Sequence, residues 1–147
     1  MDESRMLAEF RTKFQVDQLL VAATPAWSWS VRPAQPTLGA GVLSLNRHAA
    51  RFSDVTAVEM SELAELVGAM EKAVKEAFGY QIINYLMLMM VDHHVHFHVI
   101  PRYEGVRQFA GREWLDPGWP GFPALAENQH ADLDGVLTEI REALRLA

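Results

Sequence analysis

The feature that most constrains how this chain folds is a short histidine-rich run in its second half. Three histidines alternate there with three apolar residues, in the order His94, Val95, His96, Phe97, His98 and Val99. Successive side chains of a β-strand point to opposite faces. The alternation therefore predicts a strand whose apolar face packs on a core and whose other face carries a row of imidazoles. Pro101 is expected to end this strand or to place it at an edge, because proline cannot donate a ladder hydrogen bond.

Length, charge and composition limit what surrounds this strand. The 147 residues suit a single domain, and half of them are hydrophobic, as in globular proteins. The formal net charge of −6 disfavours non-specific binding to nucleic acid. The chain has no cysteine, which excludes disulfides and thiolate metal sites. We therefore expect one domain, residues 1–147, that does not bind nucleic acid.

The sequence also indicates a cytoplasmic protein. Residues 1–5 are mostly polar and precede an amphipathic segment, which is unlike a signal peptide. The longest apolar run, residues 86–91, is far too short to cross a bilayer. We expect a cytoplasmic location and no membrane partner.

Apolar spacing predicts the elements that precede the histidine strand. Residues 3–23 have helical spacing, in one or two pieces, and are expected to end before Thr24-Pro25. Residues 27–32 alternate tryptophan and valine with polar side chains, which predicts a strand with one buried and one solvent-facing side. The solvent-facing side chains would be Ser28, Ser30 and Arg32. A loop rich in proline and glycine separates this strand from the next, over residues 41–46.

A capped helix and a hydrophobic strand follow. Thr56 and Glu59 form a capping-box pattern ahead of a helix over residues 57–78. Residues 81–90 are interpreted as a strand that is buried on both faces. A tight turn near residues 91–93 would join this strand to the histidine strand.

The C-terminal part of the chain has a different character. Residues 103–130 contain many glycines and prolines, which prevent long regular elements, and several aromatic residues that favour burial. We interpret them as an ordered irregular segment packed over the domain. Residues 132–146 have helical spacing and form the last predicted helix.

The histidine row is open to three interpretations. The first is a purely structural role, and the second is a metal site. A single strand histidine is usually a surface or satisfied core residue, but a neutral row of three needs many hydrogen-bond partners. A His-x-His pair can also chelate a metal. Strand residues two apart lie about 6.6 Å apart, so two histidines could converge on one ion. His94 and His98 lie about 13 Å apart, so all three could not.

Phosphate chemistry is the third interpretation. Neutral imidazole is a nucleophile near neutral pH, and flanking imidazoles can donate hydrogen bonds to phosphoryl oxygens. A row about 13 Å long suits an extended phosphate chain better than a single ion. The middle residue, His96, is best placed to attack phosphorus.

The motif and its surroundings resemble those of a known family. Residues 94–100 follow the pattern His-apolar-His-apolar-His-apolar-apolar, the signature of the histidine-triad (HIT) superfamily. Gly39 and residues 42–48, which end in a basic residue and His48, are similar to the glycine turn and strand of that family. The resemblance covers residues 7–104 and leaves residues 105–147 as a C-terminal extension.

The resemblance implies an α+β fold, with an antiparallel sheet of about five strands and a long helix packed on it. It also implies a homodimer, a nucleotide substrate, and reaction at the α-phosphate through a covalent nucleotidyl-histidine. By position, His96 resembles the nucleophile, His98 the residue that contacts phosphoryl oxygens, and His94 the residue that orients the centre. His48 matches a histidine that many members place near the active site, although it could instead be a surface residue at a strand end.

One position departs from the family pattern. Many members carry a polar residue four positions before the first histidine, where this chain has Met90. Asn84 and Arg102 are the remaining polar candidates for a phosphate contact. Arg102 is equally compatible with a solvated strand end.

We therefore predict a nucleotide hydrolase or transferase that acts on a dinucleoside polyphosphate or a nucleoside phosphoramidate. This mechanism requires no cofactor, although a divalent cation could accompany a polyphosphate substrate. Two alternatives remain open. One is a non-catalytic nucleotide-binding or interaction protein, and the other is an enzyme that holds a metal at a His-x-His pair.

Overall fold

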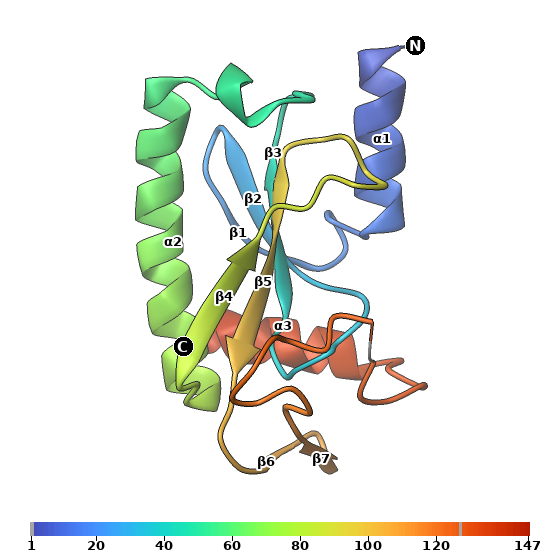
Figure 1. Ribbon diagram of the computed structural model, residues 1–147, viewed down its shortest axis with the longest axis vertical. Helices are drawn as coiled ribbons and strands as arrows, with labels where there is room; N and C mark the ends of the chain where they lie inside the picture. Colours follow the sequence, from blue (N-terminus) through green and yellow to red (C-terminus); the bar gives the residue numbers. More distant parts are fainter. Residues whose placement is uncertain (1, 127) are drawn as a thin grey trace.

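A five-stranded antiparallel sheet organises the computed structural model, which describes residues 2–126 and 128–147 (Figure 1). The strands lie in the order β1-β2-β3-β5-β4, and β6 pairs with β7 in a separate hairpin. The elements, with a 3-10 turn at Phe52–Asp54, are α1 (Glu3–Lys13), β1 (Leu20–Ala23), β2 (Trp27–Val31), β3 (Gly41–Leu45), α2 (Ala57–Phe78), β4 (Ile82–Leu86), β5 (His96–Arg102), β6 (Arg107–Phe109), β7 (Arg112–Trp114) and α3 (Val136–Leu146). None of the helices in the described ranges is long and apolar enough to cross a membrane.

Helices cover both faces of the sheet (Figure 1). Helices α2 and α3 pack on one face, where alternate strand residues such as Leu43 and Val99 join the main hydrophobic core. Helix α1 packs on the other face, where Phe10 and Phe14 form a smaller apolar cluster with Val42. The alternation along β5 therefore separates two environments, as the sequence predicts. Phe97 and Val99 face the main core, and the histidines face α1.

Helix α2 follows the predicted residues closely. Thr56 and Glu59 form a reciprocal capping box, so that two backbone N–H groups at the helix start are satisfied. Gly79 ends the helix in the left-handed conformation, with φ of 66°. The predicted helix over residues 57–78 is confirmed.

The N-terminal segment differs from the predicted helix. Helix α1 ends at Lys13, and residues Leu20–Ala23 form strand β1, which pairs with β2. The chain turns at Gln15, whose φ is 52°, and this turn sends the following apolar residues to the edge of the sheet. Hydrogen bonds to β2, the next strand along the chain, therefore overrode the local helical spacing.

The polar side of β2 is buried, so the prediction that it faces solvent was wrong. Ser28 and Ser30 lie on the face that α1 covers, and both are buried. Arg32, just beyond the strand, is partly buried beside His98. The sequence indicates the alternation of β2 but gives no sign that a helix covers its second face.

The strand before the histidines is shorter and more exposed than predicted. Strand β4 ends at Leu86 and lies at the edge of the sheet. Residues 87–95 form a loop in place of the tight turn, with Met90 79% exposed. Methionine lacks the branched side chain that favours a strand, and Met89 has a φ of 50°, which breaks the ladder.

The C-terminal segment packs over the domain, as predicted. It contains the β6–β7 hairpin, and Trp114 at the end of β7 is buried. Helix α3 begins at Val136, a few residues later than predicted, and buries Ile140 and Leu144 in the main core.

Gly39 offers a test of this packing. Its φ is +85°, and an added Cβ would lie 2.9 Å from Cδ2 of Phe78, the last residue of α2. We expect Gly39→Ala to lower the free energy of unfolding by about 1–3 kcal/mol, through backbone strain and overpacking. Urea denaturation measures the change.

Gly68→Ala is the matched control, because Gly68 lies in the exposed interior of α2 with nothing within 4 Å of an added Cβ. This substitution should raise the free energy of unfolding by up to about 1 kcal/mol. A similar gain from Gly39→Ala would contradict the packing described here.

Candidate active site

The three histidines lie side by side beneath helix α1. His96 and His98 belong to β5, and His94 lies two residues before its start. The ring centroids of His96 and His98 are 5.0 Å apart. The Phe10 ring lies 4.9 Å from the rings of both His94 and His96. This cover leaves His96 only 2% exposed.

The ring of His96 is fixed by the backbone of His94. Nδ1 of His96 lies 2.5 Å from the carbonyl oxygen of His94. A carbonyl oxygen only accepts hydrogen bonds, so Nδ1 of His96 carries the proton and donates it. In the neutral ring, Nε2 is then the unprotonated nitrogen, and its lone pair is available to attack an electrophile.

His94 is held at both ring nitrogens. Its Nε2 donates to the carbonyl oxygen of Leu45 at 2.8 Å, and its Nδ1 accepts from the backbone N–H of Ala49 at 3.4 Å. Both partners lie at or just beyond the end of β3. His94 therefore ties the start of the histidine strand to the strand beside it.

His98 takes the opposite tautomer to His96. Nε of Arg32 lies 3.2 Å from Nδ1 of His98, and the guanidinium can only donate. Nδ1 of His98 therefore accepts, and its proton lies on Nε2. The row thus places a lone pair on His96 beside an N–H donor on His98. This pairing suits attack on a phosphorus centre whose oxygens need hydrogen bonds.

Burial keeps the row neutral. Desolvation lowers the pKa of His94 and that of His98 to about 4, and the charge of Arg32 adds to the effect on His98. Burial also lowers the pKa of His96. All three rings are therefore uncharged near pH 7, which is the state that a nitrogen nucleophile requires.

His48 lies next to the row, as the resemblance implies. Its ring stacks on that of His94, with centroids 5.4 Å apart. The side chain is 7% exposed, and neither ring nitrogen has a hydrogen-bond partner among the described residues. The nearest carboxylate is that of Glu3 on α1, 4.0 Å from Nδ1.

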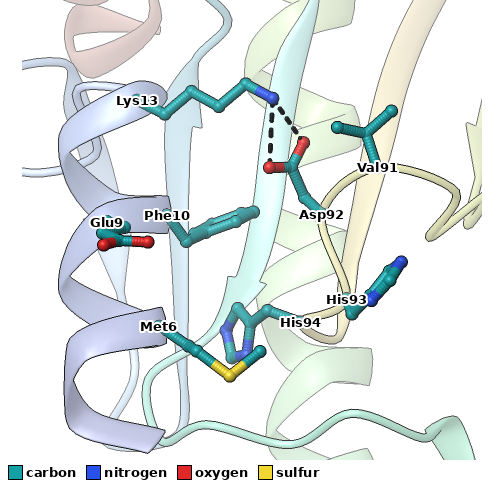
Figure 2. Close-up of a pocket in the computed structure, with 8 residues that line it drawn as sticks. All are labelled: Met6, Glu9, Phe10, Lys13, Val91, Asp92, His93 and His94. Atoms are coloured by element: carbon teal, nitrogen blue, oxygen red, sulfur yellow. Dashed lines mark hydrogen bonds and ion pairs between the residues drawn. The ribbon is translucent and has the colours of Figure 1, made fainter. Parts of the chain in front are cut away.

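An ion pair joins α1 to the loop before the histidines. Nζ of Lys13 lies 2.8 Å and 3.0 Å from the two carboxylate oxygens of Asp92. Figure 2 marks both contacts with dashed lines. A cavity of about 450 Å³ on one side of this pair reaches His94, and another of about 360 Å³ reaches His96 and His98. The ion pair therefore lies between two openings that lead to the row.

Asn84 and Arg102 are not brought to the histidine row. Arg102 lies four residues beyond His98 on β5, and its buried guanidinium binds the carboxylate of Asp116, Oδ1 of Asn84 and the carbonyl oxygen of Gly121. Both Arg102 and Asp116 are almost fully buried. Arg102 is therefore neither a solvated strand end nor free to hold a phosphate, because its partners are protein groups.

Four residues at the site were missed at the sequence level. Phe10, Lys13 and Phe14 come from α1, and Arg32 follows β2. The spacing of Phe10 and Phe14 shows an apolar helix face, and the alternation of β2 places Arg32 on the serine side. Neither pattern indicates that the two faces meet over the histidines.

No metal site is apparent in residues 2–126 and 128–147. In these ranges, no group of three or more histidine, aspartate or glutamate side chains is arranged to hold an ion.

Comparison with known proteins identifies the domain. The family model described as HIT domain matches residues 34–105, which include all three histidines of the row. No curated protein gives a significant sequence match to the chain.

Several solved structures share the fold. A hypothetical histidine triad nucleotide-binding protein from Sulfolobus tokodaii is 18% identical, with a TM-score of 0.65 over 97% of this chain and 92% of its own. A histidine triad protein from Sinorhizobium meliloti is 16% identical, with a TM-score of 0.68 over 88% of this chain and 90% of its own. One from Marinobacter aquaeolei is 15% identical, with a TM-score of 0.69 over 90% of each chain. These likenesses confirm the predicted α+β fold of histidine-triad type.

The buried pair of Arg102 and Asp116 gives a test of its structural role. Arg102→Met would leave the Asp116 carboxylate buried without its cation, so we expect the free energy of unfolding to fall by about 3–5 kcal/mol. Urea denaturation at pH 7 measures the loss.

Arg51→Met is the control, because the Arg51 side chain is 77% exposed and pairs only at the surface with Asp54. That change should alter the free energy of unfolding by less than about 1 kcal/mol. A loss below about 1 kcal/mol in Arg102→Met would show that Arg102 does not stabilise the fold.

Proposed function

The chain belongs to the histidine-triad superfamily, and from this premise we propose that it is a nucleotide-binding enzyme that reacts at an α-phosphate. The bond cleaved joins that phosphorus to oxygen in a dinucleoside polyphosphate, or to nitrogen in a nucleoside phosphoramidate. The observation that carries the proposal is the tautomer of His96. Its Nδ1–H is bound to the His94 carbonyl, which leaves Nε2 as the nucleophilic nitrogen.

In the first step, the lone pair of His96 Nε2 attacks the α-phosphorus. The bond between phosphorus and the leaving group breaks, and the leaving group departs with the bonding electrons and takes a proton from water. His98 donates its Nε2–H to a phosphoryl oxygen as negative charge gathers there. The His96 ring gains positive charge on bonding to phosphorus, and the His94 carbonyl oxygen that accepts from Nδ1 stabilises that charge.

In the second step, water attacks the phosphorus of the nucleotidyl-histidine. The bond between phosphorus and His96 Nε2 breaks, the electron pair returns to the nitrogen, and the water loses a proton to solvent. His94 contributes by holding its own backbone in place through its contacts with Leu45 and Ala49. Neither step requires a cofactor, although a divalent cation could accompany a polyphosphate substrate.

We propose that helix α1 separates from the loop of residues 87–95 to widen the access of a nucleotide to His96, because this residue is 2% exposed. The two cavities beside the Lys13–Asp92 pair are the routes that we assign to the substrate. The same cover favours a second candidate function, a nucleotide-binding protein that does not turn its ligand over.

The proposal extends to assembly and location. We propose a homodimer in the cytoplasm, as the resemblance implies. Strand β4 lies at the edge of the sheet with Ile82 exposed, which supports the pairing of two copies there.

The experiment compares wild type with His96→Ala on two substrates, an adenosine phosphoramidate and a dinucleoside polyphosphate. We expect turnover of at least one substrate by wild type, and a loss of roughly 10³-fold or more in kcat for His96→Ala. Alkaline quenching followed by peptide mass spectrometry should find a nucleotide on His96 in wild type. His130→Gln is the control, because His130 contacts Glu113 and Trp114, away from the row.

Three outcomes separate the candidates. Absence of turnover and of an adduct, with nucleotide binding retained, would favour the binding protein over the enzyme. Turnover that survives in His96→Ala would overturn the role of His96. Loss of phosphoramidate turnover on addition of a chelator would support a metal-dependent enzyme instead.

A further inference from the structure

Arg32 brings a cation to the histidine row, and no carboxylate among residues 2–126 and 128–147 forms an ion pair with it. Its Nε donates to His98 Nδ1 at 3.2 Å, and its Nη1 donates to the carbonyl oxygen of Ala34 at 3.0 Å. One of the two terminal nitrogens, Nη2, has no partner in those ranges, so the guanidinium keeps donors for a ligand.

This arrangement is unfavourable unless a ligand completes it. Arg32 is partly buried, and desolvation lowers its pKa. Taking a charge out of water costs free energy that a nearby opposite charge offsets. Arg102 provides the contrast within the same sheet, because it is also buried but is paired with Asp116. Arg32 therefore has a charge that an anion could neutralise.

The cavity beside Arg32 has room for that anion. It measures about 360 Å³, and Arg32 shares its wall with His96 and His98. Lys13 also lines the cavity, but it is paired with Asp92, so the charges of these two side chains neutralise each other. The remaining wall comes from Phe14 and from the apolar loop of residues 88–91, so Arg32 is the cation of this wall that has no carboxylate partner in the described ranges.

We propose that Arg32 and this cavity form a subsite for a second phosphate group of the substrate, next to the phosphate that His96 attacks. The inference rests on the proposed function for the first phosphate. His98 links the two positions, because its Nδ1 accepts from Arg32 while its Nε2–H remains for the first phosphate. Arg32 is then a specificity-determining residue that favours ligands with two phosphates over ligands with one. It supplies the phosphate contact that Met90 cannot make.

Isothermal titration calorimetry tests the subsite with five probes: orthophosphate, pyrophosphate, AMP, ADP and adenosine 3′,5′-bisphosphate. Wild type should bind pyrophosphate at least about 10-fold more tightly than orthophosphate. It should also bind either ADP or adenosine 3′,5′-bisphosphate at least about 10-fold more tightly than AMP. Preference for ADP would place the second phosphate on the side of the leaving group. Preference for the 3′,5′-bisphosphate would place it on the nucleoside.

Two substitutions of Arg32 separate the effect of its charge from an effect on folding. Arg32→Gln keeps an N–H donor for His98 but removes the charge, so it should abolish both preferences and reduce the affinity for the preferred two-phosphate ligand more than the affinity for AMP. Arg32→Lys keeps the charge and should restore part of the preference. Arg51→Met, at an exposed position, should bind as wild type does.

Equal affinities of wild type for the single and double phosphates would overturn the subsite. An equal loss of all five probes in Arg32→Gln would also overturn it. The proposed function fails separately. A preference for pyrophosphate without a nucleotide adduct on His96 would support the subsite but not the proposed enzyme. An adduct on His96 without any preference for two phosphates would support the enzyme but not the subsite.

Discussion

The hydrogen bond from His96 Nδ1–H to the carbonyl oxygen of His94 is the contact on which the proposed chemistry depends. It is a bond within the motif itself, from a side chain to the backbone two residues earlier. The backbone of His94 can accept it because β5 begins only at His96, so this carbonyl is not used in the sheet ladder. Irregular backbone ahead of a regular strand thus sets which nitrogen of the His96 ring is free.

The surroundings keep that ring neutral and in place. Helices α2 and α3 bury one face of the sheet, while Phe10 and Phe14 of α1 cover the histidines on the other. The cover removes water, which lowers the pKa of each histidine in the row. The same burial makes a cation such as Arg32 unfavourable without a partner, and it makes access to His96 depend on α1. The neutral charge of the histidines, the proposed anion binding at Arg32 and the restricted access to His96 therefore all follow from the packing of α1 on the sheet.

Local patterns in the sequence predicted most of the fold. The alternation over residues 94–99, the capping box at Thr56 and the helical stripe of α2 are all short-range signals, and the structure bears them out. Leu20–Ala23 was mispredicted as helix because its strand pairing is with β2, which local spacing does not report. The loop of residues 87–95 was mispredicted as strand and tight turn, because apolar methionines there resemble a buried strand. Arg32 and the phenylalanines of α1 meet the histidines only through tertiary packing, so their roles could not be read from spacing.

The tautomers and charges of the row can be measured directly by ¹⁵N NMR of the histidine side chains near pH 7, with assignments from single substitutions. We expect three neutral rings, with the proton on Nδ1 of His96 and on Nε2 of His98. Lowering the pH to 5 should leave His94 and His98 largely neutral, since the pKa of each is about 4. A proton on Nε2 of His96, or a charged His96 ring at pH 7, would rule out His96 as the nucleophile, because no lone pair would then face the substrate.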